Sequence, residues 1–365
     1  MFDAILPHLP ILQVVVPLIA APIAMLLRRP NTAWSFALVV TWVTFAIAIV
    51  LLQQVMAHGV IVYDLGGWPS PFGIIYQVDA VNAFVLLIVS GIAALVTTYG
   101  REGVLKEIQG RNQTLFFAVF LLCVSGLLGV TITGDAFNVF VFLEISSLST
   151  YVMVALGAGR DKRALSSSIS YLIMGTIGAT FFVIGIGLLY MATGTLNMAD
   201  LAARISDIGD SRMVRAAFAF IVVGLGLKLA VFPLHLWLPN AYTYAPSPVT
   251  AFLAATSTKV AVYTLMRFIF SVFGTRFAFQ EATLLYLFLP LALVGMFVPS
   301  LVALYQVNIK RMLAYSSVAQ IGYMLLGISL ASVLSVSAAT VHLFNHALMK
   351  AALFMALGAV VYRLG

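Results

Sequence analysis

The chain has 365 residues, of which 62% are hydrophobic and 8% are charged, and its mean hydropathy is +1.09. Soluble domains carry about 25% charged residues, so these values exclude a soluble globular protein and predict an all-α polytopic membrane protein. The apolar runs are continuous rather than alternating, which excludes a transmembrane barrel. The net charge of +7 does not indicate nucleic-acid binding, because the basic residues cluster in short segments between apolar runs.

The first apolar stretch carries several prolines and ends at Arg28 and Arg29 without a small-residue cleavage site. We therefore expect it to be the first span rather than a cleaved signal peptide. At about 20 residues per span, the sequence predicts about eleven transmembrane helices. Their expected limits are 5–27, 33–56, 79–99, 113–133, 135–157, 165–192, 214–238, 247–273, 282–305, 310–330 and 333–362. The polar, amphipathic stretch 197–215 is expected to lie on the outer surface.

Lysine and arginine are distributed unequally between alternate loops. One set of loops holds Arg28, Arg29, Arg101, Lys106, Arg111, Arg160, Lys162, Arg163, Lys310, Arg311 and Arg363. The other set holds Arg204, Arg212, Arg215 and Arg276. The positive-inside rule places the richer set in the cytoplasm. We therefore expect a multi-pass protein of the cell inner (plasma) membrane, with its N-terminus outside and the C-terminus of this chain cytoplasmic.

An acid and a base lie well inside two of the expected spans. Glu144 is in the fifth span and Lys228 is in the seventh. A charge near the bilayer centre costs roughly 2.5–3.5 kcal/mol, and such residues usually pair and mark an ion or proton path. Lys228 also precedes Pro233, which is expected to break the helix. Broken helices at membrane depth are frequent ion sites, so this stretch predicts one.

Further ionisable residues lie within the later spans. His342, His346 and Lys350 recur at intervals of four residues, which places them on one helix face. A histidine changes charge near pH 6.5 when unperturbed, so this row suits a proton relay. Lys259 lies inside the eighth span, and His235 follows Pro233 as a possible accessory group.

Each of these residues has a structural alternative. Glu144 and Lys228 could form a static ion pair, and Lys259 and Lys350 could bond backbone carbonyls freed by a broken helix. The histidines could be hydrogen-bonded interior residues, or interfacial in the case of His235. We favour a helix N-cap for Asp135. No carboxylate or cysteine accompanies the histidine pair, and with one cysteine, Cys123, in an apolar run no metal site and no cofactor are expected.

Several long motifs carry a family resemblance in the right order. They are Phe137–Glu144, Gly224–Asn240 with its run from Lys228 to Pro239, Asn308–Tyr323 and His342–Phe354. Together they resemble the antiporter-like, proton-translocating membrane subunits of respiratory complex I, of Mrp-type multisubunit sodium/proton antiporters and of membrane-bound hydrogenases. The stretch that begins at Phe137 is most similar to the D-type subunit of Mrp antiporters.

The resemblance implies a fold built from inverted five-helix repeats, with helices 1–3 in residues 1–110, a first repeat in 111–275 and a partial second repeat in 276–365. It implies that Glu144, Lys228, Lys259, His342, His346 and Lys350 translocate protons. Family members have about fourteen helices, so the second repeat is incomplete here. We expect either a fragment or a partner that supplies the missing exit.

The expected function is that of a subunit of a monovalent cation (Na+)/proton antiporter, acting with other membrane subunits in the lipid bilayer and not as a stand-alone enzyme. The alternative within the family is a proton-pumping subunit of a complex I-like NADH:quinone oxidoreductase or membrane-bound hydrogenase. An alternative of another class is a structural scaffold whose charges only hold helices together.

Overall fold

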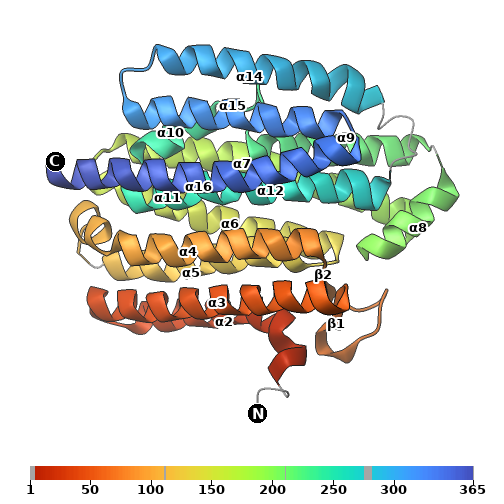
Figure 1. Ribbon diagram of the computed structural model, residues 1–365, viewed down its shortest axis with the longest axis horizontal. Coiled ribbons are helices and arrows are strands. Elements are labelled where there is room, and N and C mark those ends of the chain that lie inside the picture. Colours follow the sequence, from red (N-terminus) through yellow and green to blue (C-terminus); the bar gives the residue numbers. More distant parts are fainter. Residues whose placement is uncertain (1–4, 111, 210, 275–281, 365) are drawn as a thin grey trace.

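A computed structural model of the protein describes residues 5–110, 112–209, 211–274 and 282–364. Within these ranges, ten helices are long and apolar enough to cross a membrane. They run side by side along the long axis of the molecule (Figure 1). The predicted all-α polytopic membrane fold is therefore confirmed, and in the remaining expected span, 214–238, the long helix ends at Leu229.

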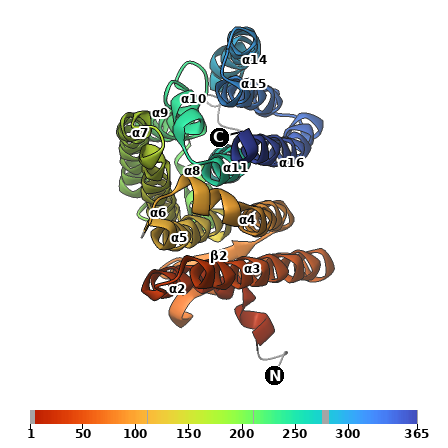
Figure 2. The same ribbon diagram turned by 90° about the vertical axis from the view of Figure 1, so that its left-hand side faces the viewer.

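The N-terminal helices form two layers. They are α2 (Leu9–Leu26), which follows a short turn at Leu6–His8, then α3 (Pro30–His58), α4 (Ala80–Glu107) and α5 (Asn112–Ile132). α2 packs on α5 and α3 packs on α4, so α2 and α3 form a layer beneath the other two (Figure 2). α4 continues past the predicted end of its span, and this extension buries Glu107.

The middle of the chain contains the seventh and eighth expected spans, neither of which is one continuous helix. Its helices are α6 (Ala136–Ala155), α7 (Arg163–Thr193), α8 (Met198–Ile208), α9 (Arg212–Leu229), α10 (Trp237–Tyr244), α11 (Ser247–Ala255) and α12 (Ser257–Met266), with 3-10 turn η3 (Leu156–Gly159) before α7 and π-helical turn η4 (Arg267–Phe273) after α12. The seventh expected span is split between α9 and α10, which confirms the predicted discontinuous helix. The eighth is split at Thr256.

The C-terminal helices cover one side of these broken spans. They are π-helical turn η5 (Leu284–Phe288), α14 (Leu289–Leu304), α15 (Ile309–Ser329) and α16 (Val333–Leu364). α14 packs on α15, and α15 packs on α16. α16 also contacts α11 and α4 (Figure 2), so the row of ionisable residues on α16 lies near the eighth span.

A hairpin and a short amphipathic helix lie at the end of the bundle opposite the C-terminus (Figure 1). The hairpin pairs β1 (Ile61–Asp64) with β2 (Ile75–Val78) in antiparallel register, and a 3-10 turn, η2 (Leu65–Gly67), follows β1. α8 buries its apolar face, consisting of Met198, Leu201 and Ile205. The helix lies within the stretch that the sequence predicted to be amphipathic.

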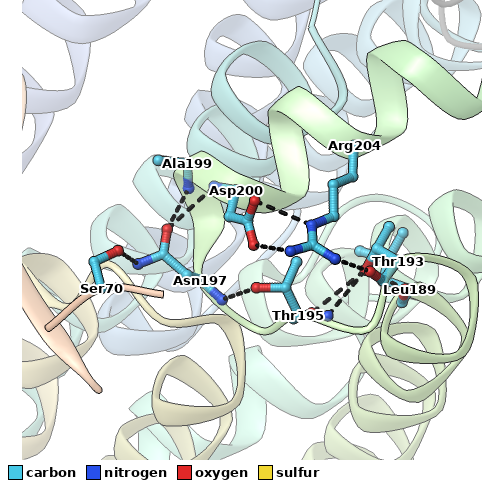
Figure 3. Close-up of polar contacts among 8 residues, drawn as sticks. All are labelled: Ser70, Leu189, Thr193, Thr195, Asn197, Ala199, Asp200 and Arg204. Carbon is cyan, nitrogen blue, oxygen red and sulfur yellow. Dashed lines mark hydrogen bonds and ion pairs between the residues drawn. The ribbon is translucent and has the colours of Figure 1, made fainter. Parts of the chain in front are cut away.

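A polar network anchors α8 to its neighbours (Figure 3). The Asn197 side chain accepts hydrogen bonds from the first N–H groups of α8 and donates one to Ser70 Oγ, 3.2 Å away. Arg204 forms a 3.0 Å ion pair with Asp200 and donates to the Thr193 carbonyl, 2.8 Å away. The hydrogen bond from Arg204 lowers the pKa of Asp200, so this carboxylate is charged at neutral pH.

Candidate functional site

Close packing of two helices positions Lys228. α7 and α9 meet at Gly178 and Gly224, where a Cβ on Gly224 would lie 2.6 Å from the Gly178 carbonyl oxygen. Small residues allow such close approach between membrane helices. Lys228 lies one turn after Gly224 on the same face, and its side chain is therefore directed between α7 and α6.

The helix ends just after Lys228. α9 stops at Leu229, four residues before Pro233, and Ala230 adopts a left-handed conformation with φ of 59°. A proline clashes with the carbonyl four residues before it, so the helix cannot continue past this point. The Leu227 carbonyl accepts a hydrogen bond from Trp237 Nε1 at 3.0 Å, and the Trp237 ring stacks on Tyr171 with centroids 4.0 Å apart. The break predicted near Pro233 is thus present and held by aromatic side chains.

Glu144 and Lys228 form an ion pair. Lys228 Nζ lies 3.0 Å from Glu144 Oε1 and 2.6 Å from Ser147 Oγ. The Lys228 side chain is 7% exposed, whereas that of Glu144 is 24% exposed. The structure therefore brings together the two charges that the sequence singled out, and Ser147 is a partner that sequence reasoning missed.

A small polar cavity adjoins Lys228. It has a volume of about 20 Å³ and is lined by Ser147, Tyr171 and Ser257 as well as by Lys228. A water molecule needs about 10–15 Å³ of such space and two or more polar partners. Ser257 Oγ is buried and has no hydrogen-bond partner in the described part of the chain. The cavity therefore has room for one water between Lys228 and the start of α12.

Lys259 lies at the break in the eighth span. Thr256, with φ of −122° and ψ of −59°, interrupts the helix between α11 and α12. Lys259 Nζ donates a short hydrogen bond to the Ala254 carbonyl and a second bond, 3.3 Å long, to Thr258 Oγ1. Its side chain is fully buried, and within the described ranges no ion pair involves it. The ammonium thus satisfies a carbonyl next to the break.

Lys350 is held in a similar way on α16. Its Nζ donates to the Leu313 carbonyl at 2.9 Å and to Ser316 Oγ at 3.0 Å, both on α15. Lys350 is 2% exposed. The Lys259 contact matches the alternative interpretation of a lysine that bonds a carbonyl freed by a broken helix, whereas the Leu313 carbonyl that Lys350 bonds lies within the continuous helix α15. Neither lysine has a carboxylate partner among the described residues.

The two histidines of α16 stack on each other. The ring centroids of His342 and His346 are 6.3 Å apart and the rings are nearly parallel. His346 is completely buried, and neither of its ring nitrogens has a hydrogen-bond partner in the described ranges; the same holds for His342 Nε2. These contacts therefore do not support the alternative in which both histidines are hydrogen-bonded interior residues.

His235 lies apart from the Glu144–Lys228 pair. It is buried in the segment between α9 and α10, where its ring packs on Phe232 at 5.2 Å and on Tyr315 of α15 at 6.1 Å. It is therefore an interior residue rather than an interfacial one. Within the described residues, no three His, Cys, Asp or Glu side chains gather in a possible metal site.

Other ionisable contacts were not anticipated from the sequence. Arg267, in the turn after α12, pairs with Asp79, which also caps α4. Glu107 is buried at the end of α4. Arg267 was missed because it lies within an apolar run, and Glu107 was missed because hydropathy placed it in a loop. Asp135 caps α6 as predicted, because its Oδ1 accepts the Asn138 N–H at 2.7 Å.

Comparison with known proteins identifies relatives of two kinds. A family model described as NADH:quinone oxidoreductase/Mrp antiporter, TM, matches residues 133–365. The N-type subunit of the NADH-quinone oxidoreductase of Desulforudis audaxviator is 42% identical over 98% of this chain and 71% of its own length. The D-type subunit of the Na(+)/H(+) antiporter of Alkalihalophilus pseudofirmus is 30% identical over 86% of this chain and 62% of its own length.

Two solved structures have the same fold. A chain of the membrane-bound sulfane sulfur reductase, an archaeal respiratory membrane complex, superposes with a TM-score of 0.89 at 33% identity, covering 96% of this chain and 71% of that chain. A chain of the Mrp complex from a Dietzia species gives a TM-score of 0.88 at 27% identity, covering 98% of this chain and 65% of that chain. This chain thus spans about two thirds of the length of such proteins.

Proposed function

Because this chain belongs to the NADH:quinone oxidoreductase/Mrp antiporter family of membrane subunits, we propose that it is a proton-translocating subunit of a multisubunit Na+/H+ antiporter. The observation that carries the proposal is the Glu144–Lys228 ion pair at the end of a broken helix, beside a cavity that accommodates a water. A buried, exchangeable ion pair next to water is what proton transfer through a membrane requires.

The proposed path begins at Lys228. While Glu144 and Ser147 hold the ammonium, its proton is retained. When Glu144 moves away, the ammonium loses its counter-charge in a poorly solvated site. Its proton then passes through a water in the cavity and Ser257 to Lys259, once Lys259 has given its own proton to the histidines of α16. From there it reaches His346, His342 and Lys350 on α16, where both ring nitrogens of His346 and Nε2 of His342 lack other partners in the described ranges.

The assembly and orientation belong to the same proposal. Relatives named as subunits of antiporters and respiratory complexes support partners that are other membrane subunits, with Na+ and protons as the transported ions. The basic end of the bundle, which contains Arg160 and Lys310, is proposed to face the cytoplasm. The division into residues 1–110, 111–275 and 276–365 and the inverted repeat stay predictions.

A second candidate function has its own support. The relative with 42% identity is a subunit of an NADH-quinone oxidoreductase, and one structural neighbour belongs to a respiratory complex. In that case the same residues would move protons while a redox reaction in neighbouring subunits drives the movement of Glu144. The shared chemistry is the proton path, and the driving reaction distinguishes the two candidates.

The test uses the complete complex in inverted membrane vesicles. Sodium-driven proton exchange without any redox substrate supports the antiporter. Proton uptake that requires quinone or another electron acceptor and is unaffected by sodium supports the redox complex. If neither driving force moves protons in the wild-type complex, the proposed function is wrong and the structural scaffold is favoured.

A further inference from the structure

An open cavity lies where the end of α2 and the start of α3 meet the start of α5. Its volume is about 860 Å³, which is within the range of ligand sites. Gln113, in the first turn of α5, donates to the Leu105 and Ile108 carbonyls at the end of α4, 3.0 and 2.8 Å away. Glu107 of that turn lies 3.6 Å from Arg160, so the cavity is at the basic end of the bundle. We call it the α2–α5 cavity.

The α2–α5 cavity carries a positive charge without a compensating carboxylate. Arg28 lines it, and neither aspartate nor glutamate is among its lining residues. In the described part of the chain, the Arg28 side chain has no hydrogen bond and no ion pair. Arg101, by contrast, pairs with Glu102 at 3.0 Å. A guanidinium group without a protein partner is suited to bind phosphate oxygens in a bidentate manner.

The short connection between α2 and α3 fixes the place of Arg28. α2 ends at Leu26 and α3 begins at Pro30, so only residues 27–29 lie between the two helices. Proline suits the first position of a helix, because the N–H that it lacks would have no partner there. The residues on both sides of Arg28 are extended, with ψ of 119° and 126°. Arg28 is therefore held directly at the end of an apolar span.

Two polar side chains of α5 complement Arg28. Thr114 is 7% exposed and lines the cavity, yet its hydroxyl takes part in no hydrogen bond within the described ranges. Both bonds of the Gln113 side chain use Nε2, which leaves Oε1 as an acceptor. The first turn of a helix also carries the positive end of the helix dipole. Together these groups fit a phosphate that has a hydroxyl group nearby.

The remaining lining is apolar and largely exposed. Met25 and Leu26, in the last turn of α2, line the cavity and are 60% and 80% exposed. Leu115 of α5 lines it from the other side. A phospholipid has the same order of groups, with a charged headgroup at the surface and acyl chains beside the apolar helix ends. A free anion would leave these apolar side chains uncovered.

We propose that the α2–α5 cavity binds an anionic phospholipid whose headgroup carries hydroxyl groups, as in phosphatidylglycerol. Arg28 and Thr114 donate to the phosphate, Gln113 Oε1 accepts from a headgroup hydroxyl, and an acyl chain lies along the last turn of α2. Basic pockets between transmembrane helices favour anionic headgroups, and the cavity offers no carboxylate to hold the cation of a zwitterionic one. The inference does not depend on the proposed function, because no lining residue belongs to the proposed proton path.

The test measures lipid binding to the complete complex. The purified complex is stripped of lipid in detergent and titrated with phosphatidylglycerol, and native mass spectrometry counts the bound lipids. Arg28→Gln is expected to weaken the binding of one lipid about tenfold, because a charge-assisted phosphate contact is lost. Arg29→Gln is the matched control, because Arg29 is the exposed neighbour of Arg28 and does not line the cavity; it is expected to leave binding unchanged. Phosphatidylcholine is expected to bind this site more weakly than phosphatidylglycerol by a similar factor.

A photoreactive phosphatidylglycerol locates the site. With the reactive group near the start of an acyl chain, cross-links are expected at Met25, Leu26 or Leu115 in the wild type and in Arg29→Gln. In Arg28→Gln these cross-links are expected to be lost. Cross-links that form only on other helices would overturn the proposal.

The remaining outcomes are equally decisive. Equal weakening by Arg28→Gln and Arg29→Gln would indicate general attraction to a basic surface and overturn a specific site. Phosphatidylcholine that binds as tightly as phosphatidylglycerol would overturn the anionic class. Displacement of the cross-linked lipid by millimolar inorganic phosphate would assign the cavity to a free anion instead. If Arg28→Gln does not assemble, Thr114→Val, which keeps the side-chain size and removes the hydroxyl, is expected to weaken binding severalfold, and unchanged binding would overturn the proposal. Proton transport enters none of these measurements, so their failure leaves the proposed function standing.

Discussion

At the scale of single residues, the proposed proton path consists of buried lysines with few or no carboxylate partners. Lys228 has one carboxylate partner and one hydroxyl partner, and that carboxylate remains partly exposed. Lys259 and Lys350 have only carbonyl and hydroxyl oxygens among the described residues. Ionisable residues inside a membrane that lack full charge compensation commonly mark proton paths, and these three lysines are of that kind.

Variants that lack one or both members of the ion pair distinguish its contribution to stability from its contribution to transport. Glu144→Gln and Lys228→Met are each expected to abolish transport and to destabilise the protein, by up to about 3 kcal/mol, because one buried charge loses its partner. The double variant is expected to regain stability and expression but not transport. Thermal unfolding of the purified complex and sodium-driven proton exchange measure the two effects. A double variant with normal transport would favour the structural scaffold.

The cavity beside Lys228 gives a second residue-scale prediction. Ser257→Val replaces a hydroxyl that has no partner among the described residues by two methyl groups, which fill part of the 20 Å³ space. We expect transport to fall about tenfold, because a water is displaced from the path, while stability changes by less than about 1 kcal/mol. Thr180→Val is the control, since Thr180 is exposed on α7 and bonds only its own helix. An equal loss in the two variants would show that the cavity is not on the path.

At the scale of helices, the two breaks explain why the ionisable residues lie where they do. Each break frees backbone carbonyls, which in a membrane must find partners inside the protein. Trp237 satisfies one near α9, and Lys259 satisfies one near α11. The breaks therefore hold polar groups at mid-bundle that a regular helix would not accommodate.

The tryptophan at the α9 break can be tested directly. Trp237→Phe keeps an aromatic ring against Tyr171 but removes the donor to the Leu227 carbonyl. The Leu227 carbonyl keeps its bond from the Ala230 N–H at 3.2 Å, so one hydrogen bond worth about 0.5–1.5 kcal/mol is lost, and we expect a lower unfolding temperature and reduced transport. Trp42→Phe removes a comparable bond from a tryptophan on α3 that is 44% exposed and is expected to change little. Unaltered stability of Trp237→Phe would contradict this account of the break.

The sequence predicted some of these features for physical reasons that can be identified. Pro233 signalled the break after Lys228, because proline is incompatible with a continuous helix, and the isolated acid and base signalled the ion pair. The break at Thr256 was not predicted, since neither glycine nor proline marks it. Ser147 and Ser257 were missed because a hydroxyl acquires a role only through the helices packed around it.

At the scale of the whole molecule, the two ends of the bundle differ in charge and in structure. One end has an open cavity lined by Arg160 and Lys310, and the other has the hairpin and α8 (Figure 1). The positive-inside rule connects this difference with a direction across the membrane. The same direction decides from which side protons reach Lys350.

Orientation is testable with two exposed positions at opposite ends. Phe72, in the hairpin, and Val307, between α14 and α15 at the basic end, are both almost fully exposed. In intact cells an impermeant thiol reagent is expected to label Phe72→Cys and not Val307→Cys, and inverted vesicles are expected to give the reverse. Labelling of Val307→Cys in intact cells would place the basic end outside and reverse the proposed direction.

The central claim is that protons cross through Lys228. The most direct measurement is the sodium-gradient-driven pH change in inverted vesicles containing the complete complex, wild type against Lys228→Ala at matched protein level. The account predicts a clear signal in the wild type and none in Lys228→Ala, although the variant still assembles. A Lys228→Ala complex that exchanges protons at the wild-type rate would contradict it.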